Sequence, residues 1–130
     1  MSTVLLDTHA IHWWSAEPRR MSKRASAALE SADELAVAAI SWLELAWLAR
    51  HERIVVKIPI RSWLQGLSEQ VRTIGLTPAI ADTAAALPSS FPADPADRLI
   101  FATAIEHDLS LVSKDRAIRE NAYPRSLVVW

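Results

Sequence analysis

The 130-residue chain contains no cysteine. This absence excludes disulfide bonds and thiolate metal sites, and it suits a reducing compartment, so we expect a cytoplasmic location. Long apolar runs are missing as well, because no stretch approaches the roughly 18 residues that a membrane span requires. The first residues lack a basic leader and reach an acid at Asp7, so we expect neither a signal peptide nor a membrane partner.

A strong excess of either charge is also missing. The formal net charge is −1 with histidine neutral, so the overall balance gives no support for a nucleic-acid partner. The chain has no H-x-x-x-H or H-E-x-x-H spacing, which argues against a histidine metal site. What is present is a composition of 51% hydrophobic and 22% charged residues, typical of a folded chain. The length predicts one domain over residues 1–130.

Short apolar runs alternate with segments of helical spacing along the whole chain. The apolar runs predict strands at residues 3–6, 35–38, 72–76, 109–113 and 127–129. Helices are predicted at residues 8–15, 22–31, 41–51, 61–71, 78–87 and 94–107, with a short turn or helix at 117–121. The alternation predicts an α/β fold in which helices cover both faces of a mostly parallel sheet.

Two helix starts carry recognisable capping patterns. Asp94 is placed to cap the helix that begins with Pro95, and Asp97 falls in its first turn, where the helix dipole stabilises a carboxylate. Asp94 could instead orient a metal-bound water, although we favour the cap. Ser41 and Glu44 form the S-x-x-E pattern of a capping box.

Four acids are predicted to meet at one edge of the sheet. Asp7 follows the first strand, Glu44 lies on the helix after the second, Asp97 opens a later helix, and Asp115 follows a late strand. The carboxyl ends of parallel strands border the usual active crevice. Two carboxylates about 4 Å apart repel by roughly 4 kcal/mol at an effective dielectric near 20, so the cluster would protonate or bind a cation. Oxygen ligands favour Mg²⁺ or Mn²⁺, which can activate a water and neutralise charge on phosphorus.

Four segments together resemble the motifs of PIN-domain proteins, in their order and spacing. They are Leu5-Leu6-Asp7-Thr8, Ser41-Trp42-Leu43-Glu44, Asp94-Pro95-Ala96-Asp97-Arg98-Leu99-Ile100 and Leu111-Val112-Ser113-Lys114-Asp115. More narrowly the chain is similar to the VapC toxins of bacterial VapBC toxin–antitoxin pairs, and the resemblance covers essentially its whole length. It implies a PIN-like three-layer α/β/α fold and a Mg²⁺- or Mn²⁺-dependent endoribonuclease that hydrolyses RNA with a metal-activated water. A VapB-type antitoxin and a homodimer are the implied partners.

The resemblance also assigns residues. It places the catalytic and metal-binding acidic quartet at Asp7, Glu44, Asp97 and Asp115, with Thr8 and Ser113 as polar neighbours. Asp94 is an extra acid, and we expect Arg98 to form an ion pair that fixes a carboxylate. His107-Asp108 stands where relatives often end a helix with glycine, and Asp108 tolerates the left-handed backbone that this position can need. A catalytically weak PIN-fold binding module, acting through an antitoxin-like partner, is the alternative function.

Several other groups have an ordinary structural interpretation beside a functional one. His9 and His12 could act on a leaving group, although packing or partner contact is the favoured interpretation. Five of the six tryptophans, at positions 13, 14, 42, 47 and 63, fall on predicted helices, so we expect some at a dimer or antitoxin surface; the alternative is that all belong to the core. Two basic clusters could contact phosphates or simply be solvated, namely Arg19, Arg20, Lys23, Arg24 and Arg50, Arg53, Lys57, Arg61.

Overall fold

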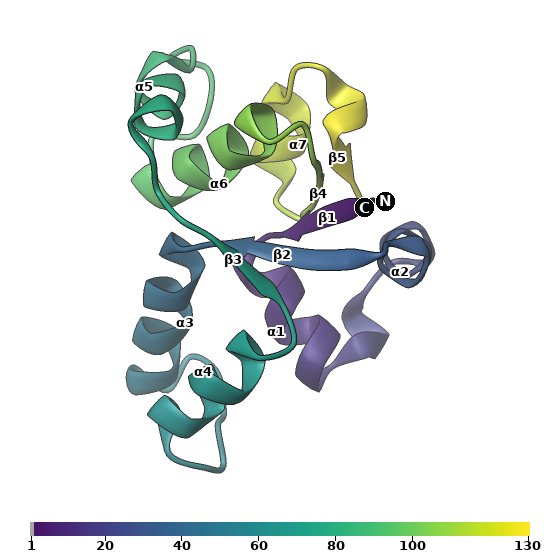
Figure 1. Cartoon of the computed structure of the whole chain (residues 1–130), viewed down its shortest axis with the longest axis vertical. Coiled ribbons are helices and arrows are strands. Elements are labelled where there is room, and N and C mark those ends of the chain that lie inside the picture. The colour runs from purple at the N-terminus through teal and green to yellow at the C-terminus, as the bar shows by residue number, and fades with distance from the viewer. Residues whose placement is uncertain (1) are drawn as a thin grey trace.

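The computed structural model describes residues 2–130 and places five parallel strands in one sheet (Figure 1). The strand order is β3-β2-β1-β4-β5, and every neighbouring pair is parallel. The strands are β1 Thr3–Leu6, β2 Glu34–Ala38, β3 Arg72–Ile74, β4 Ser110–Val112 and β5 Val128–Val129. The α/β prediction is confirmed, and the sheet that was expected to be mostly parallel is parallel throughout this part of the chain.

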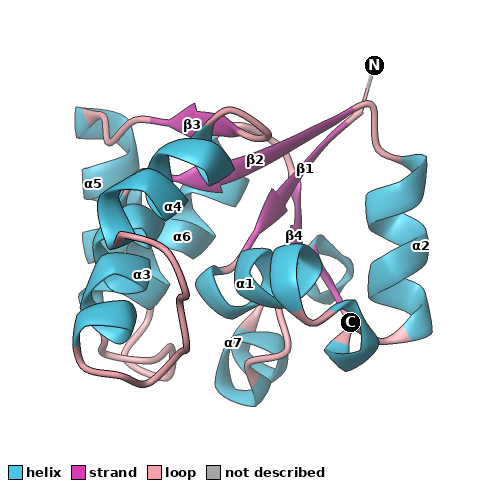
Figure 2. Ribbon diagram, turned by 90° about the horizontal axis from the view of Figure 1, so that it is seen from below, coloured by secondary structure: helices cyan, strands magenta, loops and turns pink. Residues whose placement is uncertain are grey.

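Helices cover both faces of the sheet (Figures 1 and 2). One face packs against α1 Thr8–Ala16, α2 Lys23–Ser31, α3 Ile40–Arg50 and α4 Ile60–Ser68. The other packs against α5 Pro78–Ala86, α6 Pro95–Glu106 and α7 Arg116–Asn121. Short 3-10 turns lie at Pro18–Arg20 and Arg125–Leu127. The result is the three-layer α/β/α arrangement that the sequence predicted.

The apolar character of the central strands follows from burial on both faces. Leu5 of β1 pairs in register with Ala36 of β2 and Leu111 of β4, and all three belong to the core on the α5–α6 side. Their neighbours Leu6 and Val112 point to the opposite core, against α1 and α3. Because both faces are covered, these strands are continuously hydrophobic instead of alternating with polar residues.

Local signals set most helix starts. Ser22 Oγ accepts a hydrogen bond from the Ala25 amide at 3.1 Å, and Asp94 Oδ1 accepts one from the Ala96 amide at 2.8 Å. The cap predicted for Asp94 is therefore confirmed. The capping box predicted for Ser41 and Glu44 is wrong, because α3 begins at Ile40 with Ala39 at its N-cap and no side-chain cap bond. Both side chains instead hydrogen-bond with the hydroxyl of Thr8, the first residue of α1.

The turn between α6 and β4 uses aspartate where a glycine would be common. Asp108 has φ 52°, inside the left-handed region that the sequence analysis allowed for it. The tryptophans separate by environment: Trp13 is 9% exposed and belongs to the core, whereas Trp47 is 50% exposed. The interpretation that every tryptophan is a core residue is therefore wrong. Within residues 2–130, no helix has the length and apolar character needed to cross a membrane.

Candidate functional site

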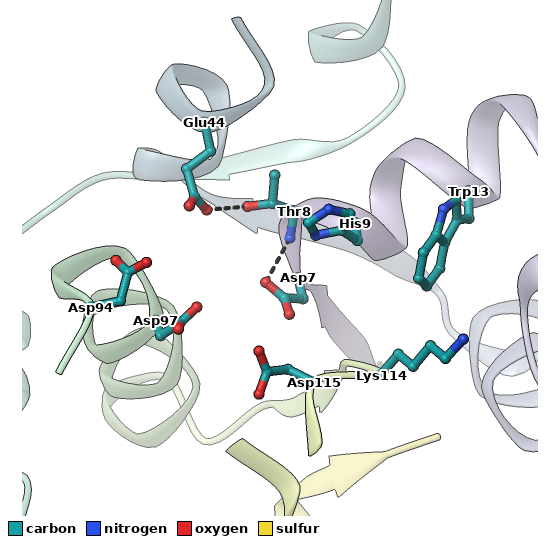
Figure 3. A pocket seen from close by; sticks show the side chains of 9 residues that line it. All are labelled: Asp7, Thr8, His9, Trp13, Glu44, Asp94, Asp97, Lys114 and Asp115. Carbon is teal, nitrogen blue, oxygen red and sulfur yellow. Dashed lines mark hydrogen bonds between the residues drawn. The ribbon is translucent and has the colours of Figure 1, made fainter. Parts of the chain in front are cut away.

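The four predicted acids line one cavity of about 520 Å³ at the carboxyl end of the sheet. Asp7, Glu44, Asp97 and Asp115 approach it from separate elements, and Asp94 adds a fifth carboxylate (Figure 3). Thr8, His9, Trp13 and Lys114 complete the lining. The structure therefore brings together acids that lie more than a hundred residues apart in the sequence, as the parallel sheet predicted.

Asp7 is the most enclosed of these acids, with 8% of its surface exposed. It lies between the end of β1 and the start of α1. Its Oδ1 accepts a hydrogen bond from the Thr8 amide at 2.7 Å, and its Oδ2 accepts one from Ser113 Oγ at 2.6 Å. The Asp115 amide in turn donates to Ser113 Oγ at 3.1 Å. Both carboxylate oxygens thus have a fixed donor, which orients the group toward the cavity.

Glu44 is held in place through Thr8. The Thr8 hydroxyl donates to Glu44 Oε1 at 2.5 Å, and its oxygen lies 3.1 Å from the hydroxyl oxygen of buried Ser41. A threonine hydroxyl has one proton, and the shorter bond to a carboxylate is the stronger one. The Ser41 hydroxyl can then donate to Thr8. This tertiary network explains why Ser41 and Glu44 do not cap α3.

Two other acids cap helices beside the cavity. Asp94 is the N-cap of α6, with Asp97 in the first turn of that helix, and Asp115 caps α7 by accepting from the Ile118 amide at 3.0 Å. Helix N-termini carry partial positive charge that favours carboxylates. The starts of two helices therefore help to gather negative charge at this edge of the sheet.

Burial and mutual repulsion raise the pKa of three of the acids. Burial, followed by repulsion from Asp94 and Asp7, raises the pKa of Asp97 from 3.8 to about 7. Burial likewise raises the pKa of Asp7, against the opposing hydrogen bonds from Ser113 and Thr8. The pKa of Glu44 is also raised, first by burial. The cavity therefore holds more negative charge than its own surroundings compensate.

The donor chemistry fits a hard divalent cation. The converging ligand atoms are carboxylate oxygens, the ligands that Mg²⁺ and Mn²⁺ prefer, and burial followed by mutual repulsion disfavours their charged form when no cation is bound. Within residues 2–130, no three acidic or histidine side chains lie close enough together to coordinate an ion directly. The carboxylates instead surround an open space, which suits an ion that keeps several of its own waters.

The ion pair predicted for Arg98 is wrong. All five guanidinium N–H groups of Arg98 donate to backbone carbonyls, over distances of 2.9–3.4 Å. The acceptors are Ala84, Leu87, Pro88, Phe91 and Pro92. These carbonyls lie at the end of α5 and in the loop before α6, where a cation is favoured by the helix dipole. Arg98 therefore fixes the loop that leads into the Asp94 cap and, within residues 2–130, forms no ion pair with a carboxylate.

Sequence reasoning underestimated two cavity residues. His9 was interpreted as a packing or partner-facing residue, yet it is exposed and lines the cavity, with its ring 5.7 Å from that of Trp13. Lys114 also lines the cavity, and its Nζ lies 5.4 Å from the centroid of Trp13 (Figure 3). The signal was present: His9 and Trp13 are four residues apart on one helical face, and Lys114 immediately precedes Asp115.

Comparisons with known proteins agree with this geometry. The PIN domain family matches residues 4–123. The chain is 66% identical to Ribonuclease VapC22 of Mycobacterium tuberculosis (strain ATCC 25618 / H37Rv). The match covers 100% of both chains. A toxin–antitoxin complex from Klebsiella pneumoniae has a similar fold, with TM-score 0.69, 23% identity and coverage of 98% of this chain and 96% of the other. VapBC2 from Rickettsia felis, bound to a promoter DNA fragment, gives TM-score 0.70 at 16% identity and coverage of 97% and 96%. The chain therefore belongs to the PIN-domain family and, within it, to the VapC type.

Proposed function

We propose that the chain is the toxin of a type II toxin–antitoxin pair and acts as a metal-dependent endoribonuclease. The observation that carries the proposal is the convergence of Asp7, Glu44, Asp97 and Asp115 on one cavity. The 66% identity to a protein named Ribonuclease VapC22 supports the same activity. We expect the four acids to act together as catalytic and metal-binding residues, in one domain that spans residues 1–130.

The proposed chemistry depends on a divalent ion, Mg²⁺ or Mn²⁺. When bound, such an ion lowers the pKa of a water and offsets the charge that develops on a phosphate. Asp7 is the carboxylate that the protein orients most rigidly, through Thr8 and Ser113. Glu44 is oriented by the Thr8 hydroxyl. These hydrogen bonds would keep the ligand oxygens in position before the substrate arrives, which is how outer partners usually support a metal site.

The reaction we propose is hydrolysis of one phosphodiester bond of RNA. Water adds to phosphorus in line with the departing 3′ oxygen, the P–O3′ bond breaks, and the products are a 5′-phosphate and a 3′-hydroxyl. The water loses a proton as it bonds to phosphorus, and the departing 3′ oxygen takes one up, so that the overall reaction consumes one water for each bond cut.

Cleavage by matched variants tests this proposal. We expect purified protein to cut a mixed RNA pool at discrete places with Mg²⁺ or Mn²⁺ and not with EDTA. Asp7→Asn, which keeps the shape of the side chain but removes its charge, should abolish cutting while the protein stays folded. Asp82→Asn removes an exposed carboxylate of α5 and is the control that should cut normally. Cleavage by Asp7→Asn at the rate of the unmodified protein would refute the assignment.

The rival function, a binding module without cleavage, gives a different result in the same assay. Such a protein would leave every RNA intact with either metal, and titration calorimetry would find no divalent ion bound. If the ion binds but no RNA is cut, the pool lacks the substrate. That result would call for a broader pool of structured RNAs.

We also propose a VapB-type antitoxin and a second copy of the chain as protein partners. The related solved structures include a toxin–antitoxin complex and a VapBC2 assembly, which supports this pairing. In this chain, Leu43 and Leu76 are 65% and 61% exposed and line an apolar hollow of about 260 Å³ together with Ile40 and Ile80. Exposed apolar surfaces of this kind commonly mark interfaces. Light scattering of Leu43→Ser beside the unmodified protein tests the dimer. The variant dimer should be weaker, so it should dissociate into monomers at a higher protein concentration than the unmodified dimer.

A further inference from the structure

A second cavity of about 680 Å³ adjoins the acidic one. The two share His9 and Trp13 as a common wall, and the second extends between α1, α3 and the loop that follows α3. Its lining includes Arg20, Arg53 and Lys57, and we call it the basic cleft. Two cavities of opposite charge are therefore continuous along one side of the molecule.

The cations of the basic cleft are available for a ligand. In the part of the chain that the structure describes, the two ion pairs between permanently charged groups join Arg72 to Glu34 and Arg116 to Glu120, and neither involves Arg20, Arg53 or Lys57. All three are exposed. Glu17 is the acid in the cleft lining, and it lies 3.3 Å from Nε2 of His12, whose pKa is lowered by burial. The lining therefore carries three cations and one carboxylate, and this excess of positive charge favours an anionic occupant.

Trp13 connects the two cavities electrostatically. The Arg20 guanidinium carbon lies 5.4 Å from the Trp13 ring centroid on the side of the cleft, and Lys114 Nζ lies 5.4 Å from it on the side of the acids. The two cations are thus separated by no more than twice that distance. Trp13 is nearly buried, so it positions the cations and cannot itself stack on a base. Half-exposed Trp47 supplies an aromatic surface farther along the cleft.

We propose that the basic cleft binds the RNA strand on one side of the scissile phosphate. Lys114 and Arg20 contact the phosphates next to the cleavage point, and Arg53 and Lys57 contact phosphates farther away. This inference rests on the proposed ribonuclease function, since it places the reacting phosphate at the acids. A strand whose phosphate is held there continues into neighbouring space, and the adjoining cleft offers cations for its backbone and an aromatic ring for a base. An overall net charge of −1 conceals this local basic surface.

RNA binding without cleavage tests the cleft directly. The probe is a fluorescein-labelled single-stranded RNA of about 20 nucleotides, long enough to exceed a typical site, followed by anisotropy in EDTA. The variant Arg20→Gln/Arg53→Gln/Lys57→Gln should bind at least about ten-fold more weakly. Its slope of log affinity against log salt should fall by about 0.7 for each lost phosphate contact, or about 2 in all. Lys23→Gln/Arg61→Gln/Arg119→Gln removes the same charge outside the cleft and should change both quantities much less.

Cleavage kinetics separate this inference from the proposed function. With Mg²⁺, the cleft variant should show a raised KM and an unchanged kcat on the long RNA. On an RNA too short to reach Arg53 and Lys57, the double variant Arg53→Gln/Lys57→Gln should match the unmodified protein. If the cleft variant binds and cuts like the control variant, the cleft proposal is refuted while the ribonuclease assignment stands. The cleft proposal would also be refuted if the cleft variant bound RNA normally but no longer retained a protein partner that co-purifies with the unmodified protein. That result would assign the cleft to the protein partner. If the unmodified protein neither binds nor cuts RNA, both proposals fail.

Discussion

Removing the charge of Asp97 should stabilise the metal-free protein even though it destroys the proposed activity. The pKa of Asp97 is about 7 in the folded chain, against an ordinary value of 3.8. Between those two pH values the folded state binds a proton that the unfolded state has released. The free energy of unfolding therefore falls as the pH rises from about 4 to about 7, and above that it no longer depends on this group.

The size of the effect follows from the difference between the folded and unfolded pKa of Asp97. A tenfold change in an acid's dissociation constant is worth about 1.4 kcal/mol, which sets an upper limit of about 4 kcal/mol for the destabilisation. Asp97 is only half-buried, so water screens part of the repulsion and we expect about 2 kcal/mol. Its carboxylate forms no side-chain hydrogen bond within residues 2–130, so asparagine loses no partner. For a chain of this size, about 2 kcal/mol corresponds to a rise of roughly 6 °C in Tm.

Thermal unfolding of Asp97→Asn in EDTA, followed by circular dichroism, measures this stabilisation. We expect the variant to be more stable than the unmodified protein at pH 8 and to lose most of that advantage at pH 4, where Asp97 of the folded protein is neutral. Asp82→Asn carries the same charge change on exposed α5 and should gain almost nothing at either pH. A variant that is no more stable at pH 8, or that gains equally at pH 4, would refute the argument that the half-buried charge of Asp97, repelled by its neighbours, destabilises the fold.

Four further substitutions probe the supports of the site and the core. Thr8→Val removes the hydroxyl that orients Glu44, and we expect divalent-ion affinity, measured by calorimetry, to fall about ten-fold with little change in Tm. Arg98→Met removes five hydrogen bonds to backbone carbonyls, so chemical denaturation should show that the free energy of unfolding falls by about 3 kcal/mol. An unchanged denaturation midpoint would mean that the loop before α6 keeps its conformation without these bonds. Trp13→Ala should cost about 3–5 kcal/mol because this ring is nearly buried, whereas Trp47→Ala should cost less than about 1 kcal/mol, and equal losses would contradict the environments described above.

The fold and the clustering of the four acids could be predicted from the sequence because both depend on regular patterns. Continuous apolar runs such as Leu5 and its neighbours identify strands buried on both faces. Parallel pairing then places Asp7 and Asp115 at the same edge without any knowledge of side-chain contacts. The Asp94 cap was predictable as well, because a cap is a local hydrogen bond between neighbours in sequence.

The errors arose where a tertiary contact competes with a local pattern. Ser41 and Glu44 have the spacing of a capping box. Both side chains instead hydrogen-bond with the hydroxyl of Thr8, which lies 33 and 36 residues away in the sequence. Arg98 adjoins Asp97 in sequence, yet successive helical residues point in different directions, and the guanidinium reaches the carbonyls of the preceding loop. Continuity between the acidic cavity and the basic cleft could not be predicted, because it depends on how α1 packs beside α3.

The acidic cavity illustrates how a candidate functional site opposes stability. Burial, and then repulsion between neighbouring carboxylates, raises the pKa of acids gathered at the sheet edge, and the surrounding fold must offset this cost. A divalent ion would relieve it. We therefore expect Mg²⁺ to raise the Tm of the unmodified protein more than that of Asp97→Asn.

The chemical ends of the RNA products test the central claim most directly. We predict that cleavage in Mg²⁺ leaves a 5′-phosphate and a 3′-hydroxyl, identified by mass spectrometry of the fragments, and that EDTA stops it. This outcome follows if water attacks the phosphate at a divalent ion held by Asp7 and its three partner acids. Fragments that end in 2′,3′-cyclic phosphate, formed equally well in EDTA, would instead mean that the ribose hydroxyl is the nucleophile. That result would contradict the metal-dependent account.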